Sequence, residues 1–134
     1  MKIIAVGMNY ADHVKELDGS FVRPEEPVIF LKPDSALLKD GKPFFIPDFS
    51  QEVHYEAELV VRICRLGKNI AERFAHRYYD AVTVGIDFTA RDLQRKFRSV
   101  GDPWELSKGF DSSAAIGDFV SVDKFHILQN LKFH

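Results

Sequence analysis

The sequence predicts a β-rich α+β fold, with several short strands and a few short helices. Short apolar runs ended by Gly, Pro or Asp recur along the 134 residues, a pattern typical of strands. The 12 phenylalanines suit a β-rich core, whereas helical spacing is limited to short segments. The length allows one core of ordinary size, so we expect a single domain over residues 1–134.

The N-terminal elements are predicted from apolar runs and from the turn residues between them. Strands are expected at "KIIAVG" (residues 2–7) and "VIFLKP" (residues 28–33). Asn9 can cap a short helix over residues 9–18. Asp40-Gly41, between the apolar runs of "ALLKDGKPFFIP", predicts a β-hairpin.

The central part of the chain predicts the longest strand and a helix. The stretch "VHYEAELVV", extended to Cys64, alternates over residues 53–64 and is the longest expected strand. In "NIAERFAHRYYDAV" (residues 69–82), Ile70, Phe74 and Tyr78 recur at i, i+4 and i+8. This spacing puts the three side chains on one face of a helix, so a helix is expected there.

The C-terminal part predicts a strand, a helix and a further strand. The expected strands are "VTVGID" (residues 82–87) and "GDFVSV" (residues 117–122). Between them, Thr89 can cap a helix that ends near Gly101. The final "LKFH" looks like the opening of a strand with no turn signal after it. We therefore expect the domain of residues 1–134 to be incomplete at its C-terminal end.

Composition narrows the class of protein. A formal net charge of −2 provides no basic surface for nucleic acid or for an anionic membrane. The only cysteine, Cys64, excludes an internal disulfide framework and fits a reducing compartment. The chain contains no apolar span of membrane-crossing length. The sequence therefore favours a cytoplasmic protein.

The central strand carries two glutamates one alternation apart. His54, Glu56, Glu58 and Val60 share one face of this strand, because side chains alternate between faces. A solvent-exposed face explains this pattern in many antiparallel sheets. The alternative is that the two carboxylates hold a cation, since no lysine alternates with them along the strand.

Asp87 adds a third carboxylate at the end of an apolar strand. An aspartate at this position is often a helix cap or a turn former. Thr89 is available to cap the following helix, however, so capping explains Asp87 less well. Three carboxylates converging in a partly buried site repel one another and take up protons unless a cation is present. Oxygen-only ligands favour Mg²⁺, Mn²⁺ or Ca²⁺ over zinc. Spacing alone leaves both interpretations open.

Several other groups are candidate site residues, each with an ordinary alternative. His13 and Glu16 stand at i, i+3, so the carboxylate can orient the imidazole as a base, or the pair is an exposed helix pair. Arg91 and Gln94 are also i, i+3 and lie near the site if Asp87 does. Lys108, in a loop rich in Gly and Ser, can bind a substrate carboxylate or a developing oxyanion, or be solvated. Cys64, His54 and His126 lack zinc-like spacing and are interpreted as structural.

Five segments together resemble the fumarylacetoacetate hydrolase family, and the similarity covers most of the chain. In chain order they are "GMNYADHVKEL", "VIFLKP", "HYEAELVVRI", "GIDFTARDLQ" and "WELSKGFDSSAAIG". The short, single-domain acylpyruvase and oxaloacetate-decarboxylase-like members are the most similar. The resemblance implies a mixed β-roll and a homodimer.

The resemblance also implies roles for individual residues. It makes Glu56, Glu58 and Asp87 the ligands of a Mg²⁺ or Mn²⁺ ion, with Ca²⁺ as an alternative occupant. His13 and Glu16 match a dyad that activates water. The remaining matches line the substrate and oxyanion side of the site: Lys32, Arg91, Gln94 and Lys108.

The implied activity is cleavage of a C–C bond in a 2-oxo or 1,3-dicarbonyl acid, by acylpyruvate hydrolysis or oxaloacetate decarboxylation. Isomerisation of 2-hydroxy-dienedioates is an alternative within the same family. Members of the family continue beyond the point that corresponds to His134, through a "TGTP"-like turn that contacts substrate. A catalytically silent fragment that binds a metal or a partner subunit is therefore a second hypothesis, and a β-sandwich that binds Ca²⁺ structurally is a third.

Overall fold

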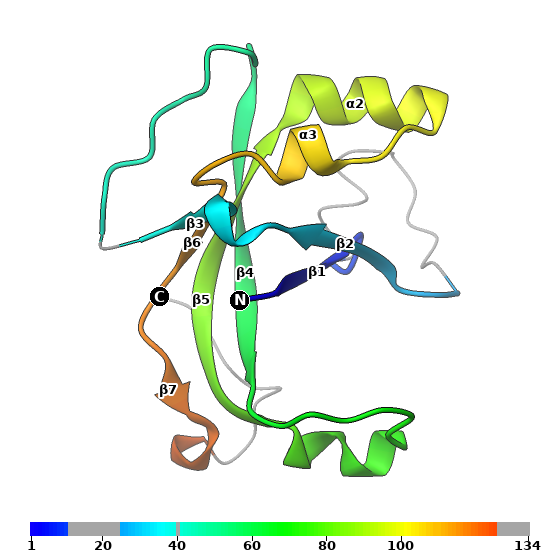
Figure 1. Ribbon diagram of the computed structural model, residues 1–134, viewed down its shortest axis with the longest axis vertical. Helices are drawn as coiled ribbons and strands as arrows, with labels where there is room; N and C mark the ends of the chain where they lie inside the picture. Colours follow the sequence, from blue (N-terminus) through cyan, green and yellow to red (C-terminus); the bar gives the residue numbers. More distant parts are fainter. Residues whose placement is uncertain (11–24, 40, 126–134) are drawn as a thin grey trace.

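The computed structural model describes residues 1–10, 25–39 and 41–125. Two long antiparallel strands, β4 (Val53–Ile63) and β5 (Tyr79–Ala90), run side by side along the molecule (Figure 1). Three short strands complete this sheet: β6 (Ala114–Ile116), β7 (Val120–Ser121) and β3 (Leu37–Leu38). The first two pair antiparallel with β5, and β3 pairs parallel with β6. The sheet is therefore mixed, and the predicted β-rich α+β class is confirmed.

Two helices lie toward one end of the long strands, and a second sheet lies nearer their middle (Figure 1). Strands β1 (Ile3–Gly7) and β2 (Val28–Lys32) pair antiparallel and form this two-stranded sheet. Helix α2 (Arg91–Val100) follows β5 directly, and the short helix α3 (Glu105–Lys108) comes next. Short 3₁₀ turns are found at Asp34–Ala36, Glu72–Arg77 and Val122–Lys124.

Most predicted strands are present. β1, β2 and β4 match the expected strands at residues 2–7, 28–33 and 53–64, and β5 contains residues 82–87. The helix after β5 ends as predicted, because Gly101 takes a left-handed conformation with φ 79°. Most of the helix expected over residues 9–18 lies outside the described residues.

The helix predicted over residues 69–82 is wrong. Only a 3₁₀ turn forms, at Glu72–Arg77, and Tyr79 already belongs to β5. The apolar spacing serves tertiary packing instead. A Cβ atom placed on Gly67 would lie 2.4 Å from the Tyr78 ring and 2.9 Å from Ile70, so both side chains crowd this glycine. The two ends of the connection between β4 and β5 are joined by a hydrogen bond from the Cys64 N–H to the Tyr78 carbonyl oxygen, at 2.9 Å.

Three further local predictions differ from the structure. The described residues on either side of Gly41 do not pair as a hairpin: β3 pairs with β6, and the Phe44 ring stacks on Phe88 with centroids 3.8 Å apart. Thr89 does not cap α2, because it lies within β5 and Ala90 takes the N-cap position without a side-chain bond. The last strand is shorter than expected and covers Val120–Ser121.

The buried centre of the described chain is unusually polar. Its buried apolar residues are small ones: Ala36, Ala81, Val82, Ala90 and Ala114. The buried polar and charged residues are Lys32, Ser50, Asp87, Thr89, Arg91, Gln94, Ser107, Lys108 and Ser113. Burying so many polar groups is unfavourable unless they bind one another or a ligand. The interior therefore contains a polar site, and it lies where β5, β2 and α3 meet.

The two faces of β4 are buried in the opposite sense to an ordinary half-exposed strand. Glu56 and Glu58 are half-buried, whereas Tyr55, Leu59 and Val61 on the other face are exposed. The acidic face is thus the inner face, and a simple solvated outer face does not explain it.

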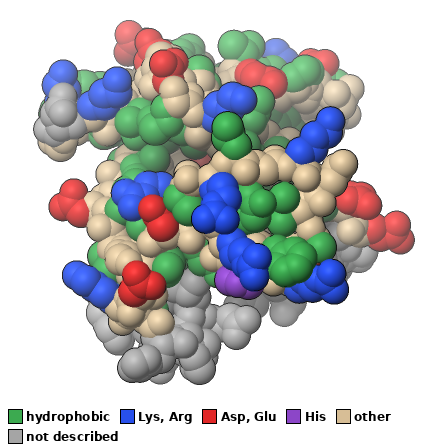
Figure 2. Space-filling view, turned by 60° about the horizontal axis from the view of Figure 1, so that its bottom comes forward, with side chains coloured by type: hydrophobic (Ala, Val, Ile, Leu, Met, Phe, Trp, Pro, Cys, Tyr) green, Lys and Arg blue, Asp and Glu red, His purple; other side chains and the backbone are tan. Residues whose placement is uncertain are grey.

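The opposite end of the molecule, formed by the connection between β4 and β5, carries exposed arginines beside aromatic rings. Arg73 and Arg77 both lie over the Phe74 ring, with centroid distances of 4.9 and 4.8 Å. Figure 2 turns this end toward the viewer and shows Lys and Arg side chains among hydrophobic ones. None of the helices in the described ranges is long and apolar enough to cross a membrane.

Candidate metal and oxo-acid site

Three carboxylates converge on the inner face of the β4–β5 pair. The register sets Glu56 directly opposite Asp87 and Glu58 opposite Gly85. One carboxylate oxygen of each of Glu56, Glu58 and Asp87 lies within 4.8 Å of the other two. Like charges on directly opposed residues destabilise a sheet, so this arrangement requires positive charge nearby.

Lys108 supplies the first positive charge, between Glu56 and Asp87. Its Nζ atom donates to Glu56 Oε2 at 2.7 Å, to Asp87 Oδ2 at 2.8 Å and to Thr89 Oγ1 at 2.6 Å. Lys108 is 3% exposed and ends helix α3, where the sequence predicted a loop. The short helix after α2 therefore inserts one ammonium group between two strand carboxylates.

Lys32, the last residue of β2, supplies a second buried charge. Its Nζ atom lies 2.8 Å from Asp87 Oδ1 and donates to the Ser113 carbonyl at 3.0 Å and to Ser113 Oγ at 3.1 Å. It also donates to the Lys108 carbonyl oxygen. Burial lowers the pKa of Lys32, although Asp87 opposes this effect. Lys32 thus links the two-stranded sheet to the carboxylates and to the end of α3.

Arg91, the first residue of α2, supplies the third charge. Its guanidinium is buried and donates to Glu56 Oε1 from one terminal nitrogen and to Gln94 Oε1 from the other. Gln94 lies one turn further along α2 and is also buried. Every polar contact of Glu56 described so far is therefore with a cation.

The pKa values of the two glutamates diverge. Burial alone raises the pKa of Glu56, but Lys108 and Arg91 together hold it below its ordinary value. The pKa of Glu58 is raised to about 7, mainly by burial. A hydrogen bond with Tyr10 opposes this rise, and the charges on Asp87 and Glu56 add to it. Tyr10 also accepts the Leu59 N–H at 3.2 Å. Glu58 is therefore the carboxylate that lacks a cation of its own among the described residues.

The donor set fits a divalent cation. All three ligand candidates offer oxygen, which suits a hard ion such as Mg²⁺ or Mn²⁺. Asp87 Oδ1 is buried and accepts no hydrogen bond from any described group, although it lies near the Lys32 ammonium. A cation beside Glu58 also offsets the repulsion that raises the pKa of this group. Glu56, Glu58 and Asp87 can hold such an ion.

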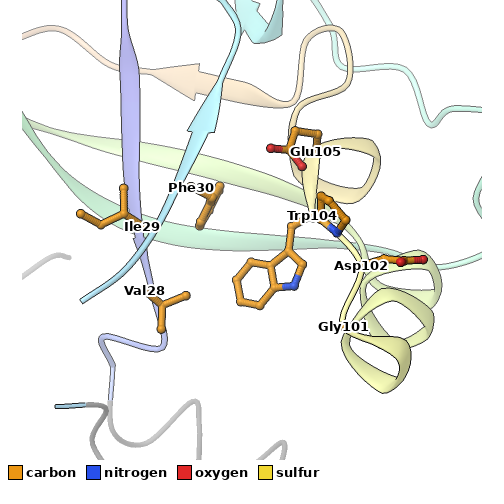
Figure 3. A pocket seen from close by; sticks show the side chains of 8 residues that line it. Val28, Ile29, Phe30, Gly101, Asp102, Trp104 and Glu105 are labelled. Carbon is orange, nitrogen blue, oxygen red and sulfur yellow. The ribbon is translucent and has the colours of Figure 1, made fainter. Parts of the chain in front are cut away.

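A groove of about 330 Å³ opens beside the cluster, between β2 and the turn from α2 to α3 (Figure 3). Its apolar wall includes Val28, Phe30 and Trp104, and Asp102 and Glu105 add carboxylates. Phe30 separates the groove from the cluster, because its ring centroid lies 5.9 Å from that of Trp104 and 5.4 Å from Lys108 Nζ. The groove therefore lies on the far side of the Phe30 ring from Lys108, which does not line it.

The candidate residues predicted from the sequence fall into two groups. The structure brings together Glu56, Glu58, Asp87, Lys32, Arg91, Gln94 and Lys108. His13 and Glu16 lie outside the described residues, and their roles stay predictions.

Three contributors to the site were missed. Thr89 shares the alternation of Asp87 along β5, so strand periodicity could have identified it. Tyr10 and Ser113 carry no comparable signal, because tertiary packing alone brings them to the cluster.

Comparison with known proteins identifies the class of protein to which this fold and site belong. Residues 2–134 match the family described as fumarylacetoacetate (FAA) hydrolase C-terminal. The chain belongs to this family, and the recognition of it in the sequence is confirmed.

Individual relatives sharpen the comparison. Oxaloacetate tautomerase of Escherichia coli is 40% identical over 124 residues, which cover 92% of this chain and 56% of that protein. Mitochondrial oxaloacetate decarboxylase of Dictyostelium discoideum is 40% identical over 132 residues, covering 98% and 60%. Fumarylpyruvate hydrolase from Pseudomonas aeruginosa, solved with Mn²⁺ and pyruvate, aligns with a TM-score of 0.84 at 35% identity, covering 92% and 55%. The chain spans about half of the length of the curated relatives it matches.

Proposed function

We propose that this chain forms the metal- and substrate-binding part of an enzyme that acts on 2-oxo acids of the oxaloacetate or acylpyruvate type. The observation that carries the proposal is the cluster of three carboxylates, surrounded by three buried cations, in a chain of this family. The names of the relatives support oxaloacetate and fumarylpyruvate as the class of substrate.

Glu56, Glu58 and Asp87 would hold a Mg²⁺ or Mn²⁺ ion in this proposal. An ion held there would supply Lewis acidity for the 2-oxo group of the substrate. Glu58 must lose its proton to serve as a ligand, whereas Arg91 and Lys108 keep Glu56 ionised.

Lys108 would stabilise negative charge that develops on the substrate, because its ammonium is buried beside the carboxylates. Arg91, Gln94 and Lys32 would orient the substrate carboxylate from the same side. His13 and Glu16 would activate water for hydrolysis, as the resemblance of the sequence implies. A homodimer in the cytoplasm completes the proposal.

Tautomerisation of oxaloacetate is a second candidate reaction, favoured by the names of several relatives. It needs proton transfer at C3 and no attacking water. Cleavage and tautomerisation can therefore use the same carboxylates and Lys108 while differing in their need for His13.

The test compares Glu58→Gln with Glu72→Gln, an exposed glutamate in the β4–β5 connection. Mn²⁺ binding is measured by titration calorimetry. Pyruvate release from acetylpyruvate and from oxaloacetate, and the keto–enol exchange of oxaloacetate, are measured in parallel. Glu58→Gln should weaken Mn²⁺ binding by about 100-fold or more, since even partners of metal ligands contribute 10- to 100-fold. Glu72→Gln should behave as the wild type.

Two results would contradict the proposal. Equal Mn²⁺ affinity of the wild type and Glu58→Gln would remove the metal role of the cluster. Oxalate, a mimic of an enolpyruvate-like intermediate, is titrated in the same way. A chain that binds neither Mn²⁺ nor oxalate would support the silent-fragment hypothesis instead.

A further inference from the structure

A chain of polar contacts leads from the molecular surface to Glu56 through His54. Arg91 has three nitrogen positions, and each has a different partner. The terminal nitrogens donate to Gln94 and Glu56, as described above, and Nε donates to His54 Nδ1 at 3.3 Å. On its other side, His54 Nε2 lies 2.9 Å from Glu52 Oε1.

These contacts define the tautomer of His54. Arg91 Nε always carries a hydrogen and can only donate, so His54 Nδ1 must be the unprotonated acceptor. The remaining ring proton is then on Nε2, where it points at the Glu52 carboxylate. Glu52 is held in turn by Arg95, whose NH1 donates to Oε1 at 3.0 Å. The imidazole is therefore fixed on both sides.

We propose that His54 is a positioning residue for the carboxylate cluster: its Nδ1 atom orients Arg91, and Arg91 orients Glu56. Arg91 is 2% exposed, so its Nε–H cannot turn to water if the acceptor is lost. A guanidinium is planar, and reorientation to satisfy Nε moves both terminal nitrogens together. Loss of the His54 acceptor therefore displaces the donor that holds Glu56 Oε1.

The functional consequence rests on the proposed metal role of Glu56. A misplaced Glu56 binds a divalent ion less well, as for other partners that orient metal ligands. His54 itself is not a catalytic residue in this scheme. Its side chain is 44% exposed and is separated from the carboxylates by Arg91.

Three substitutions separate the Nδ1 contact from general packing. His54→Asn keeps an acceptor oxygen at the position of Nδ1. His54→Gln places its amide at the position of Nε2 and keeps only the contact with Glu52. His54→Leu removes both contacts while retaining similar bulk. His76→Leu, at an exposed histidine of the 3₁₀ turn Glu72–Arg77, is the matched control.

The first readout is Mn²⁺ affinity by titration calorimetry, with the thermal midpoint followed by circular dichroism. His54→Leu and His54→Gln should weaken Mn²⁺ binding by about 10- to 100-fold. His54→Asn should stay within about threefold of the wild type, and His76→Leu should bind as the wild type. A purely structural role predicts instead that affinity follows the thermal midpoint. Wild-type affinity in His54→Leu, or equal losses in the Asn and Gln variants, would overturn the proposal.

The second readout does not depend on the metal. Long-range ¹H–¹⁵N spectra of the metal-free wild type should show His54 protonated on Nε2 and an Arg91 Nε–H signal protected from exchange. That protection should persist in His54→Asn and be lost in His54→Gln. A proton on His54 Nδ1 would overturn the proposal. If the wild type fails to bind Mn²⁺, the proposed function fails, while these spectra still decide the contact between His54 and Arg91.

Discussion

The two halves of the β4–β5 pair contain the same kinds of charged group in opposite environments. The inner half contains the opposed residues Glu56 and Asp87, and Lys108, whose side chain is 3% exposed, joins these two carboxylates. Near its outer half, Arg62 pairs with Asp80 at 2.7 Å, but the two side chains are 51% and 45% exposed. Water screens the outer pair and not the inner one, so equal contact lengths correspond to unequal free energies. Burial, not the presence of an ion pair, distinguishes the site from the surface.

The largest effect is expected from Lys108→Met, which removes the shared cation of the inner half. Two carboxylates are then left without their bridging charge, and the free energy of unfolding should fall by about 3–5 kcal/mol. Mn²⁺ should restore more stability to the variant than it adds to the wild type, because it replaces the missing positive charge. Urea unfolding with and without Mn²⁺ measures both effects.

The exposed Lys68→Met serves as the control for that experiment. It should unfold as the wild type under both conditions. A Lys108→Met protein as stable as the wild type without Mn²⁺ would show that the inner carboxylates are neutral, and the contrast between the two halves would then disappear.

The next effect is expected from Gly85→Ala, opposite Glu58 in the inner half. A Cβ atom at Gly85 would lie 2.6 Å from Val60 Cγ2 and 3.0 Å from the Ala115 carbonyl oxygen. Overpacking of this kind costs about 1–3 kcal/mol of unfolding free energy. Thermal and urea unfolding measure the loss.

A second substitution tests whether the clash with Val60 causes the loss of stability in Gly85→Ala. Val60→Ala removes the nearer clash, so the double variant should be less destabilised than the sum of the single variants. Additive losses would mean that the backbone at Ala115, and not Val60, is the limiting contact.

The strands were predictable from the sequence because their signal is local. Alternation and the terminal turn residues give β1, β2, β4 and half of β5 without knowledge of the fold. The prediction of a helix around Phe74 is wrong because Ile70 and Tyr78 pack against Gly67 and do not form the apolar face of a helix. Helical spacing alone does not exclude such packing.

The site residues also divide into those with a local sequence signal and those placed by tertiary packing. Glu56 and Glu58 share a face by alternation, but the choice between a solvated face and a cation site depended on Asp87 and on the five family segments. The position of Lys108 between the carboxylates follows from how α3 packs on β5, which no local pattern encodes. The structural interpretation of His54 rests on its lack of zinc-like spacing. Its contact with Arg91, which is distant in the chain, leaves no signal in the local sequence.

A smaller effect is expected from titration, where the two halves shift carboxyl pKa values in opposite directions. Burial and neighbouring charges raise the pKa of Glu58 to about 7, whereas Arg62 lowers that of Asp80. Because the folded pKa of Glu58 is raised, its favourable contribution to stability is fully present below the ordinary value. It is lost as the pH rises through about 7. Metal-free wild type should therefore lose stability over this range relative to Glu58→Gln.

Carboxyl ¹³C signals recorded across the pH range measure this shift directly. Tyr10→Phe should raise the pKa of Glu58 further, because the hydrogen bond from Tyr10 lowers it. An ordinary pKa for Glu58 in the metal-free protein would contradict the half-buried position of its carboxyl group.

The smallest effect is expected at the outer pair, where Arg62→Met and Asp80→Asn should leave the thermal midpoint unchanged within error. Both side chains are exposed, so water replaces the lost partner and salt screens what attraction remains. Arg62 also lies over the Phe119 ring at 5.3 Å, so Met keeps most of its apolar contact. A thermal scan of each single variant and of the double variant, at low and high salt, tests this. A loss comparable to that of Lys108→Met would mean that the register shift between Arg62 and Ile63, and not burial, governs the energetics of the β4–β5 pair.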